Sequence, residues 1–366
     1  MQFITTRDLL FEALQKVAGV IERRSTMPIL ANVLLRVQDE QLILVGTDLE
    51  IELVTQIRVK GDAGATTVPA RKLLDICRLL PVGSSIQCTL KDEKTLTVKA
   101  GRSRFSLTTL PGDNFPEFKL KGEETEAHIG SESLGKLLSS TMYAMAQQDV
   151  RYYLNGLLLE LDGNLIHAIA SDGHRLAWCE QFLQQPVAEL KQPIVPRKGI
   201  QELARLIEGD DQPLSLHLTD NAIRLVLPNV TFSAKLIDGR YPNYRRVFPD
   251  KISRVITCDR QALKDAISRV SILSNEQYRG IRLDCSENLL RLSAHNPEQE
   301  EAEEVLEVLY QGAPFSVGLN ASYMTDAVSH LQAETITLSF AEQNLTCLIE
   351  DPEDPAVRYI VMPMRL

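Results

Sequence analysis

The chain has 366 residues, more than one hydrophobic core usually serves, so we expect two or three domains. A hydrophobic content of 44% with 24% charged residues is ordinary for a soluble globular protein, and 5% aromatic residues argue against a broad stacking surface for single-stranded bases. The formal net charge of −10 argues against a protein that binds nucleic acid over its whole surface, although it allows one basic face.

The N-terminal sequence MQFITTRDLLFEALQ carries charges where a signal peptide needs an apolar core, and no apolar run of about 18 residues follows. We therefore predict a cytoplasmic protein with no membrane contact. The six cysteines form no CxxC pair and no metal-ligand spacing; they stand at positions 77, 88, 179, 258, 285 and 347. We predict buried, reduced thiols, with no metal site and no cofactor.

The first third of the chain predicts two helices and several short strands. Thr6 is a plausible N-cap for an amphipathic helix with apolar residues at Leu10, Leu14, Val17 and Ile21. After it come a hairpin, the polar segment TDLE and a further strand, IELVTQIRV. A second helix, RKLLDICRLL, and three alternating strands, IQCTL, TLTVK and RFSLTTL, complete the unit.

This order of elements occurs twice more. The hairpin NVLLRVQDEQLILVGTDLEIEL returns as NGLLLELDGNLIHAIASDGHRLAW and as GIRLDCSENLLRLSAHNPEQEE. We call the polar segment that ends each hairpin an elbow. The elbows hold Asp48, Asp172 and Asn296, at spacings of 172 − 48 = 124 and 296 − 172 = 124 residues. The second helices agree, because Arg71 and Arg197 are 197 − 71 = 126 residues apart. Fixed spacing and order predict three domains of one topology.

Each predicted domain is α+β, with two helices and two small antiparallel sheets, over residues 1–122, 123–252 and 253–366. At about 10 Å per helix, the six helices of one copy close a circle too narrow for duplex DNA. Twelve helices from two copies leave a hole of roughly 28 Å, against a duplex at least ~16 Å thick. The arithmetic favours a dimeric ring with helices inside and sheets outside. Cations recur on the helices of the first two repeats, as on many surface helices, but ASYMTDAVSHL has none.

The two ends of the chain offer complementary surfaces for a head-to-tail dimer. The strand GRSRFSLTTL puts Arg102 and Arg104 on one face and Phe105 and Leu107 on the other. The third repeat offers an acidic run and the end of an apolar helix face; its predicted interface residues are Ile272, Leu273, Glu298, Glu300, Glu301, Glu303 and Glu304. Contact between these ends would cover a strand edge and close a ring. An isolated, solvated acidic run is the alternative.

Several motifs together resemble the bacterial DNA polymerase III beta subunits, the sliding clamps. They run in order along essentially the whole chain: GTDLE, VPARK, GRSRFSL, QDVRYYLNG, SDGHRLA, IVPRKG, LIDGRYPNYRRV, LSNEQYRG, NPEQEEAEE and VMPMRL. The resemblance implies a homodimeric ring around duplex DNA that tethers the replicative polymerase, without base-sequence specificity. The clamp loader and other proteins with short clamp-binding peptides are further implied partners.

The resemblance also implies residue roles. The DNA-contacting positions would be Arg24, Arg71, Gln148, Tyr152, Tyr153 and Lys198. Such cations and hydrogen-bonding groups touch phosphates without reading bases, so a ring can slide. Lys72, next to Arg71, would join the dimer interface. The residues alone leave another possibility open, since the tyrosine pair could belong to a strand core.

The resemblance places a peptide-binding pocket between the second and third repeats. Its lining would be Leu154, Ser171, Gly173, His174, Arg175, Leu176, Pro242, Arg246, Val247, Tyr323, Ile360, Met362, Pro363 and Met364. Adaptable methionines, aliphatic side chains and a few polar groups suit a short peptide. Without the resemblance, a Met-rich tail is more often core than pocket. Family members often carry Thr at the position of Ser171, a change of one methyl group.

An enzyme is the competing class of function, and the adjacent Ser171, Asp172 and His174 are its best candidates. The sequence contains no GxSxG, P-loop, HExxH or GxGxxG motif. A catalytic triad needs convergence in space, which adjacency does not provide. The equivalent elbows lack histidine at the position of His174, so we interpret the element as structural and the protein as non-catalytic. A scaffold that binds proteins but no DNA is a third possibility.

Overall fold

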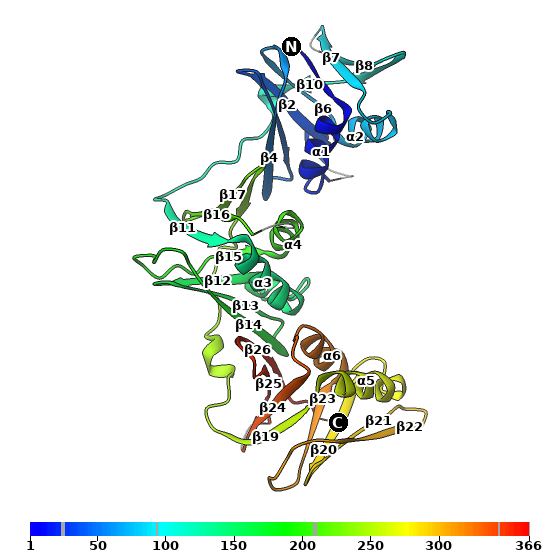
Figure 1. Cartoon of the computed structure of the whole chain (residues 1–366), viewed down its shortest axis with the longest axis vertical. Helices are drawn as coiled ribbons and strands as arrows, with labels where there is room; N and C mark the ends of the chain where they lie inside the picture. The colour runs from blue at the N-terminus through cyan, green and yellow to red at the C-terminus, as the bar shows by residue number, and fades with distance from the viewer. Residues whose placement is uncertain (23–25, 93, 208–210, 343–344, 366) are drawn as a thin grey trace. The chain divides into compact units, whose positions relative to one another are not determined.

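The computed structural model describes residues 1–22, 26–92, 94–207, 211–342 and 345–365. The chain divides into two compact units (Figure 1). The first comprises Met1–Gly130 and Gln201–Leu236, and the second comprises Ser131–Ile200 and Ile237–Leu366. The helix α4 (Arg197–Leu206) carries the chain from the second unit into the first.

The first unit contains two antiparallel sheets and the helices α1 (Arg7–Ala18) and α2 (Ala70–Leu79). A five-stranded sheet has the order β5 (Lys60–Asp62), β1 (Gln2–Thr6), β7 (Ser85–Lys91), β8 (Thr95–Ala100), β9 (Ser103–Thr108). A nine-stranded sheet has the order β10 (Leu110–Pro111), β6 (Gly64–Pro69), β2 (Asn32–Gln38), β3 (Gln41–Thr47), β4 (Ile51–Arg58), β18 (Val230–Lys235), β17 (Ala222–Leu227), β16 (Pro213–Leu218), β11 (Thr125–Gly130). The two helices lie side by side (Figure 1).

The helix α1 follows from its sequence. The predicted N-cap is confirmed, because the Thr6 hydroxyl accepts a hydrogen bond from the Leu9 amide at 3.4 Å. The buried stripe includes Leu10, Leu14 and Val17, and it packs on β3 and β4. The expected continuation of this stripe to Ile21 is wrong, since the helix ends at Ala18.

The second unit contains α3 (Ser131–Thr141), α5 (Arg260–Val270) and α6 (Ala321–Ser329) with two more antiparallel sheets. An eight-stranded sheet has the order β15 (Ile194–Pro196), β12 (Gly156–Asp162), β13 (Leu165–Ser171), β14 (Arg175–Phe182), β26 (Asp354–Val361), β25 (Cys347–Asp351), β24 (Thr335–Ala341), β19 (Ile252–Asp259). A four-stranded sheet has the order β22 (Glu301–Glu307), β21 (Leu289–His295), β20 (Gly280–Ser286), β23 (Phe315–Asn320). Helix α3 packs on β13 and β14, and α5 packs on α6, β21 and β22.

The predicted α+β fold with two helices per repeat is confirmed, but the sheets are shared between repeats. Strand β4 of the first repeat pairs with β18 of the second, and β14 of the second pairs with β26 of the third. Each pairing satisfies backbone groups that an isolated repeat would expose at a strand edge. The described residues therefore form four sheets, where independent repeats would form six.

The acidic run of the third repeat is a strand, which the sequence analysis missed. Strand β22 pairs with β21 in register from Glu301 opposite His295 to Glu307 opposite Leu289. Its residues alternate between exposed and half-buried, with Ala302, Glu304 and Leu306 on the half-buried face. Glu301, Glu303 and Glu307 of this strand are exposed, as in the solvated acidic run that we gave as the alternative.

The junction of β4 and β18 contains a buried carboxyl group, Glu52, opposite Ser233. Burial raises its pKa to about 7, against the attraction of Arg224 and a hydrogen bond to the Phe118 backbone. Unfolded, the carboxyl group loses its proton near pH 4.5. Between these pH values the folded state binds more protons than the unfolded state, so the free energy of unfolding falls as pH rises from about 4.5 to 7.

We expect Glu52→Gln to stabilise the first unit at pH 8 by about 1–3 kcal/mol and to change its stability little at pH 4.5. The measurement is thermal unfolding of both proteins across this range. Glu50→Gln is the control, because Glu50 is an exposed partner of Lys235. Parallel pH profiles for Glu52→Gln and the wild type would contradict the prediction.

Candidate functional site

The elbow of the second repeat is held by its own hydrogen bonds. The Ser171 hydroxyl donates to the Arg175 carbonyl at 2.7 Å and accepts from the Gly173 amide at 3.1 Å. One Asp172 carboxylate oxygen accepts from the amides of His174 and Arg175 at 2.9 and 3.1 Å. The serine and the aspartate therefore fold the turn, as Asx and Ser/Thr turns do.

The first-repeat elbow has the same atomic pattern. The Thr47 hydroxyl donates to the Ile51 carbonyl at 2.8 Å and accepts from the Leu49 amide at 3.0 Å. Asp48 accepts from the amides of Glu50 and Ile51 at 2.9 and 2.7 Å. Because an elbow without histidine makes identical bonds, the interpretation of this element as structural is confirmed.

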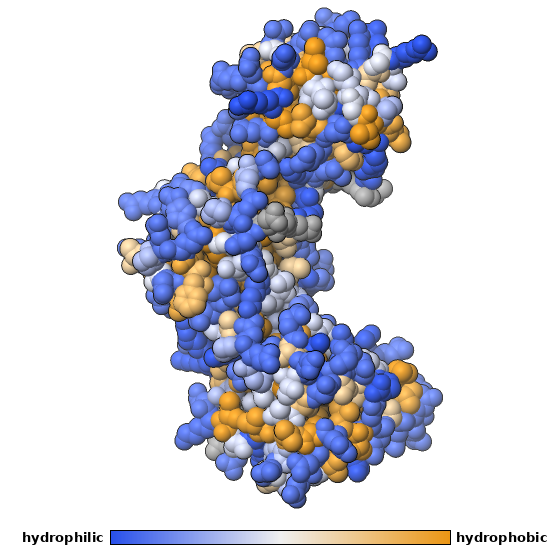
Figure 2. All heavy atoms as spheres, viewed as in Figure 1, coloured by the Kyte–Doolittle hydropathy of each residue, from blue (hydrophilic) through white to orange (hydrophobic). Residues whose placement is uncertain are grey.

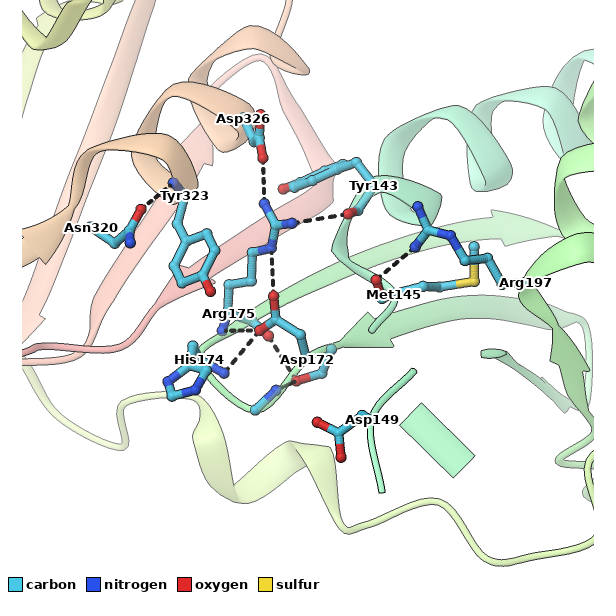
Figure 3. A network of polar contacts seen from close by, with 12 residues as sticks. Tyr143, Met145, Asp149, Asp172, His174, Arg175, Arg197, Asn320, Tyr323 and Asp326 are labelled. Carbon is cyan, nitrogen blue, oxygen red and sulfur yellow. Dashed lines mark hydrogen bonds and ion pairs between the residues drawn. The ribbon is translucent and has the colours of Figure 1, made fainter. Parts of the chain in front are cut away.

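Arg175 joins this elbow to helices on either side (Figure 3). Its guanidinium donates to the Asp172 carboxylate at 3.0 Å, to the Tyr143 carbonyl at 3.1 Å and to the carboxylate of Asp326 on α6. It also lies over the Tyr323 ring, 4.6 Å from the centroid. Arg175 thus joins the elbow to the 3₁₀ turn Met142–Ala144 after α3 and to α6.

A cavity of about 450 Å³ opens beside this network. His174, Arg175 and Tyr323 of the predicted pocket line it, and the His174 ring stacks on the Tyr323 ring at a centroid distance of 6.4 Å. Tyr143 also lines the cavity, and neither Tyr143 nor Asp326 was predicted. No local motif marks them, since they reach Arg175 from positions 32 and 151 residues away.

The loop before the hairpin is bonded to the elbow. Arg151 donates to the Asp172 carbonyl at 3.0 Å and pairs with Asp149 at 2.8 Å. Gly173 has a φ of +89°, and a Cβ there would lie 2.7 Å from the Arg151 guanidinium. The positive φ therefore favours glycine, although Leu49 adopts a φ of +78° at the same place in the first-repeat elbow, and a side chain at position 173 would also displace the Arg151 guanidinium.

An apolar cluster adjoins the elbow and contains further predicted pocket residues. Leu176 and Ile360 are buried in it, and Val247 packs against it. Leu154 is also buried, so these side chains form an interior wall. The other predicted lining residues are more accessible; Met362 and Met364 are half-buried, whereas Pro242, Arg246 and Pro363 are exposed.

The C-terminal tail is tied to this region by two backbone bonds. The Met362 amide donates to the His174 carbonyl at 2.9 Å. The Met364 amide donates to the Gly318 carbonyl at 2.9 Å. The tail therefore connects the elbow with the four-stranded sheet of the same unit.

The predicted DNA-contacting residues lie in both units. Arg71, at the start of α2, and Gln148 are exposed, and Lys198 on α4 is half-buried. Tyr152 is 57% exposed, and its ring stands 5.7 Å from that of Tyr153 in a T-shaped contact. Tyr153 packs against the apolar cluster, so the packing role that we left open applies to this residue. Arg24 lies outside the described residues.

The predicted dimer surfaces coincide with two outermost strands, β9 and β22. On β9, Arg104 is exposed and Phe105 half-buried, whereas Leu107 is 7% exposed and belongs to the core of the first unit. Arg102 and Lys72 are exposed. On β22, Glu301 and Glu303 point to the exposed face.

The acidic residues are not equivalent. Glu304 lies on the opposite face of β22 from Glu303 and pairs with Arg269 of α5 at 2.6 Å. Glu300 accepts from the Asn296 side chain at 2.6 Å, and Glu298 is exposed in the same turn. Glu303, on the exposed face of β22, lies 3.6 Å from the exposed Arg291, so this face offers carboxylates to an incoming basic strand.

Exposed apolar residues accompany both strands. Ile272 is exposed and Leu273 half-buried in the turn of 3₁₀ helix that follows α5. Leu79, the last residue of α2, and Val82, which follows it, are 85% and 81% exposed and were not predicted. Hydrophobic patches are visible on the face of each unit in Figure 2. The only sequence signal for Leu79 and Val82 was the apolar run LLPV, which continues beyond the predicted helix.

Other predictions concern buried or absent features. The predicted burial of the cysteines is confirmed, since all six are buried free thiols. Within the described ranges, no helix has the length and hydropathy to cross a membrane. The same residues contain no cluster of His, Cys, Asp or Glu arranged to hold a metal ion.

The chain contains three repeated α+β domains whose sheets are shared. One outermost strand carries an exposed arginine and another carries exposed glutamates. This is the class of protein built from repeated domains that assembles through its strand edges. Family models for the N-terminal, central and C-terminal domains of the DNA polymerase III beta subunit match residues 1–119, 128–243 and 245–365. The chain therefore belongs to the DNA polymerase III beta subunit family, the sliding clamps that encircle DNA and give its polymerase processivity.

Individual relatives agree over their full length. The chain is 46% identical to the beta sliding clamp of Pseudomonas aeruginosa and 45% identical to that of Escherichia coli K12, with all of each chain covered. Its structure matches the crystal structure of the P. aeruginosa beta subunit with a TM-score of 0.97 at 46% identity, and that of the Caulobacter crescentus subunit with 0.94 at 33%. Both comparisons cover 100% of both chains. Another P. aeruginosa clamp structure, with a TM-score of 0.96, contains bound griselimycin. The family and function implied by the sequence are confirmed.

Proposed function

We propose that two copies of this chain close a ring around duplex DNA through β9 of one copy and β22 of the other. The observation that carries this proposal is the pair of outermost strands with opposite charge, Arg104 on one and Glu301 and Glu303 on the other. Pairing them would extend the five-stranded sheet into the four-stranded sheet and satisfy both backbone edges. Exposed Leu79, Val82 and Ile272 would add apolar contact.

Inside the ring, Arg71, Gln148, Tyr152 and Lys198 would contact the phosphate backbone, and Arg24, which lies outside the described residues, would join them. Such contacts carry no base preference and let the ring slide. Tyr153 supports Tyr152 from the apolar cluster. The protein acts as a non-catalytic subunit, because Ser171 and Asp172 are occupied by turn hydrogen bonds. Its place is the cytoplasm, where bacterial DNA is replicated.

Retention on circular DNA tests the topological part of this function. Clamps loaded by a clamp loader onto nicked circular DNA should stay bound through gel filtration at high salt, and linearising the circle should release them. A protein scaffold would show no retention on either DNA, and a nonspecific binder would be retained equally on both. Either result would contradict the ring.

We further propose that partner peptides bind where the elbow, the apolar cluster and the tail meet. We call this surface the peptide groove. Gly173 and His174 would meet the peptide backbone, whereas Leu176, Val247 and Ile360 would underlie its apolar side chains. The arrangement suits a short extended peptide with hydrophobic residues.

Removing Met362 to Leu366 should abolish peptide binding and leave the ring intact. Strand β26 ends at Val361, so the eight-stranded sheet keeps its pairings, whereas the Met362 bond to His174 is lost. We expect at least a 100-fold rise in the Kd of a fluorescent polymerase-tail peptide, about 2.7 kcal/mol. Unchanged retention on circular DNA is the control, and unchanged peptide affinity would exclude this groove.

A further inference from the structure

A second cavity, of about 450 Å³, lies beside the proposed peptide groove. It opens between the loop 240–245, strand β12 and Gln192. Pro242 lines it and is also a predicted groove residue. Leu158, in its wall, belongs to the same apolar cluster as Leu176 and Ile360. The cavity and the groove therefore share a wall, and residues 240–245 of the motif LIDGRYPNYRRV line the cavity.

Arg245 is held in one orientation at this cavity. Its Nη2 donates to Glu160, its Nη1 lies 3.5 Å from the second oxygen of that carboxylate, and its guanidinium sits 4.9 Å from the centroid of the Tyr244 ring. The side chain is nevertheless 61% exposed. A guanidinium has five N–H donors, so these contacts leave several donors directed to solvent. The Arg245 guanidinium is thus already oriented before a ligand binds.

The buried Glu160 balances one of the two cavity arginines. Burial alone would raise its pKa, but hydrogen bonds from Gln192, Tyr244 and Arg245 outweigh burial and lower the pKa. Glu160 is therefore ionised and neutralises Arg245. Arg240 is exposed and forms no hydrogen bond or ion pair with the described residues. The wall itself contains no acidic residue, so the cavity has an unbalanced positive charge.

We propose that this cavity is a subsite for a carboxylate, the side chain of an aspartate or glutamate that flanks the apolar core of a partner peptide. The inference rests on the proposed peptide groove and adds a determinant of partner choice to it. Arg240 supplies the net charge, and the N–H groups of Arg245 that are not bonded to Glu160 supply oriented hydrogen-bond donors for the carboxylate. The Asn243 side chain, also in the wall, can accept or donate a further hydrogen bond.

The test uses fluorescent polymerase-tail peptides that share one core and differ only in flanking Asp-Asp or Asn-Asn pairs, placed before or after the core. Wild-type protein should bind one Asp-Asp peptide about 5-fold more tightly than the matching Asn-Asn peptide. This ratio corresponds to the upper end of the free energies measured for exposed ion pairs. The preference should shrink as salt rises. Arg240→Glu should reverse the preference and leave the affinity of the amide peptide unchanged.

Arg36→Glu is the matched control, because Arg36 is exposed on β2 of the first unit and changes the net charge equally. Equal loss of preference in both variants would overturn the subsite in favour of long-range attraction. The subsite would also be overturned if all peptides bound with the same affinity whatever their flanking residues. If no peptide bound at all, the peptide groove itself would be contradicted. If Arg240→Glu lowered only retention on DNA, Arg240 would serve phosphates and the proposal would be wrong.

Discussion

Arg175→Ala should destabilise the second unit by about 1.5–3 kcal/mol, the range for losing hydrogen bonds to charged groups, because Asp172 is 17% exposed and Asp326 is 44% exposed. The Arg175 side chain is only 13% exposed. Its loss leaves the carboxylates of Asp172 and Asp326 without their cation and the Tyr143 carbonyl without this donor. Because α6 and the elbow are both held by this side chain, we expect peptide binding to fail with the local structure.

Native-state hydrogen exchange is the suitable measurement, since it reports opening of α6 and β14 separately from the first unit. Arg175→Lys keeps the charge but cannot serve three acceptors in one plane, so it should restore only part of the protection. Arg151→Ala is the matched control. Its side chain is 44% exposed and its ion pair with Asp149 is worth about 1 kcal/mol or less. Equal losses for Arg175→Ala and Arg151→Ala would refute a special role for Arg175.

Charge reversal at the proposed ring closure should act strongly on assembly. Arg104→Glu would place a carboxylate against the exposed face of β22, and we expect the dimer Kd to rise by roughly 30- to 100-fold, about 2–3 kcal/mol. The reason is like-charge repulsion with Glu303, which points to that face. Sedimentation at nanomolar concentration measures the fraction of dimer.

A second substitution makes this prediction specific to the face of the strand. Glu303→Arg in the same chain as Arg104→Glu should restore dimerisation, because the pair is exchanged. Glu304→Arg should not restore it, since Glu304 lies on the opposite face and is paired with Arg269. Rescue by both, or by neither, would show that β9 and β22 do not meet as proposed.

Local patterns predicted most of the secondary structure. Thr6, followed by apolar residues at helical spacing, marked α1, and the turn at Gly163, with a φ of +57°, marked the second hairpin. The triple repeat followed from the spacing of the elbows. These features depend on neighbours in sequence, which is why they could be predicted without the structure.

Features that depend on distant partners could not be predicted. The joined sheets bring Val54 opposite Thr231, a pairing that no local pattern encodes. The acidic run did not indicate a strand, because strands rarely carry so many glutamates. In the structure Glu304 of β22 pairs with Arg269, and α5 packs on this strand. For the same reason Asp326 was missed, because its relation to Arg175 exists only in three dimensions.

The joined sheets have a consequence for synthesis on the ribosome. The edge of β4 is complete once residue 58 has been made, but its partner β18 ends at residue 235. Val54 and its partner Thr231 are 231 − 54 = 177 residues apart, so at about 5–20 residues per second the edge waits roughly 9–35 s for its partner. During that time β4 pairs with β3 on one side and presents an unpaired edge on the other. A chaperone that covers residues 51–58, or a slow codon stretch within this interval, would therefore change the yield of folded protein without altering its final stability.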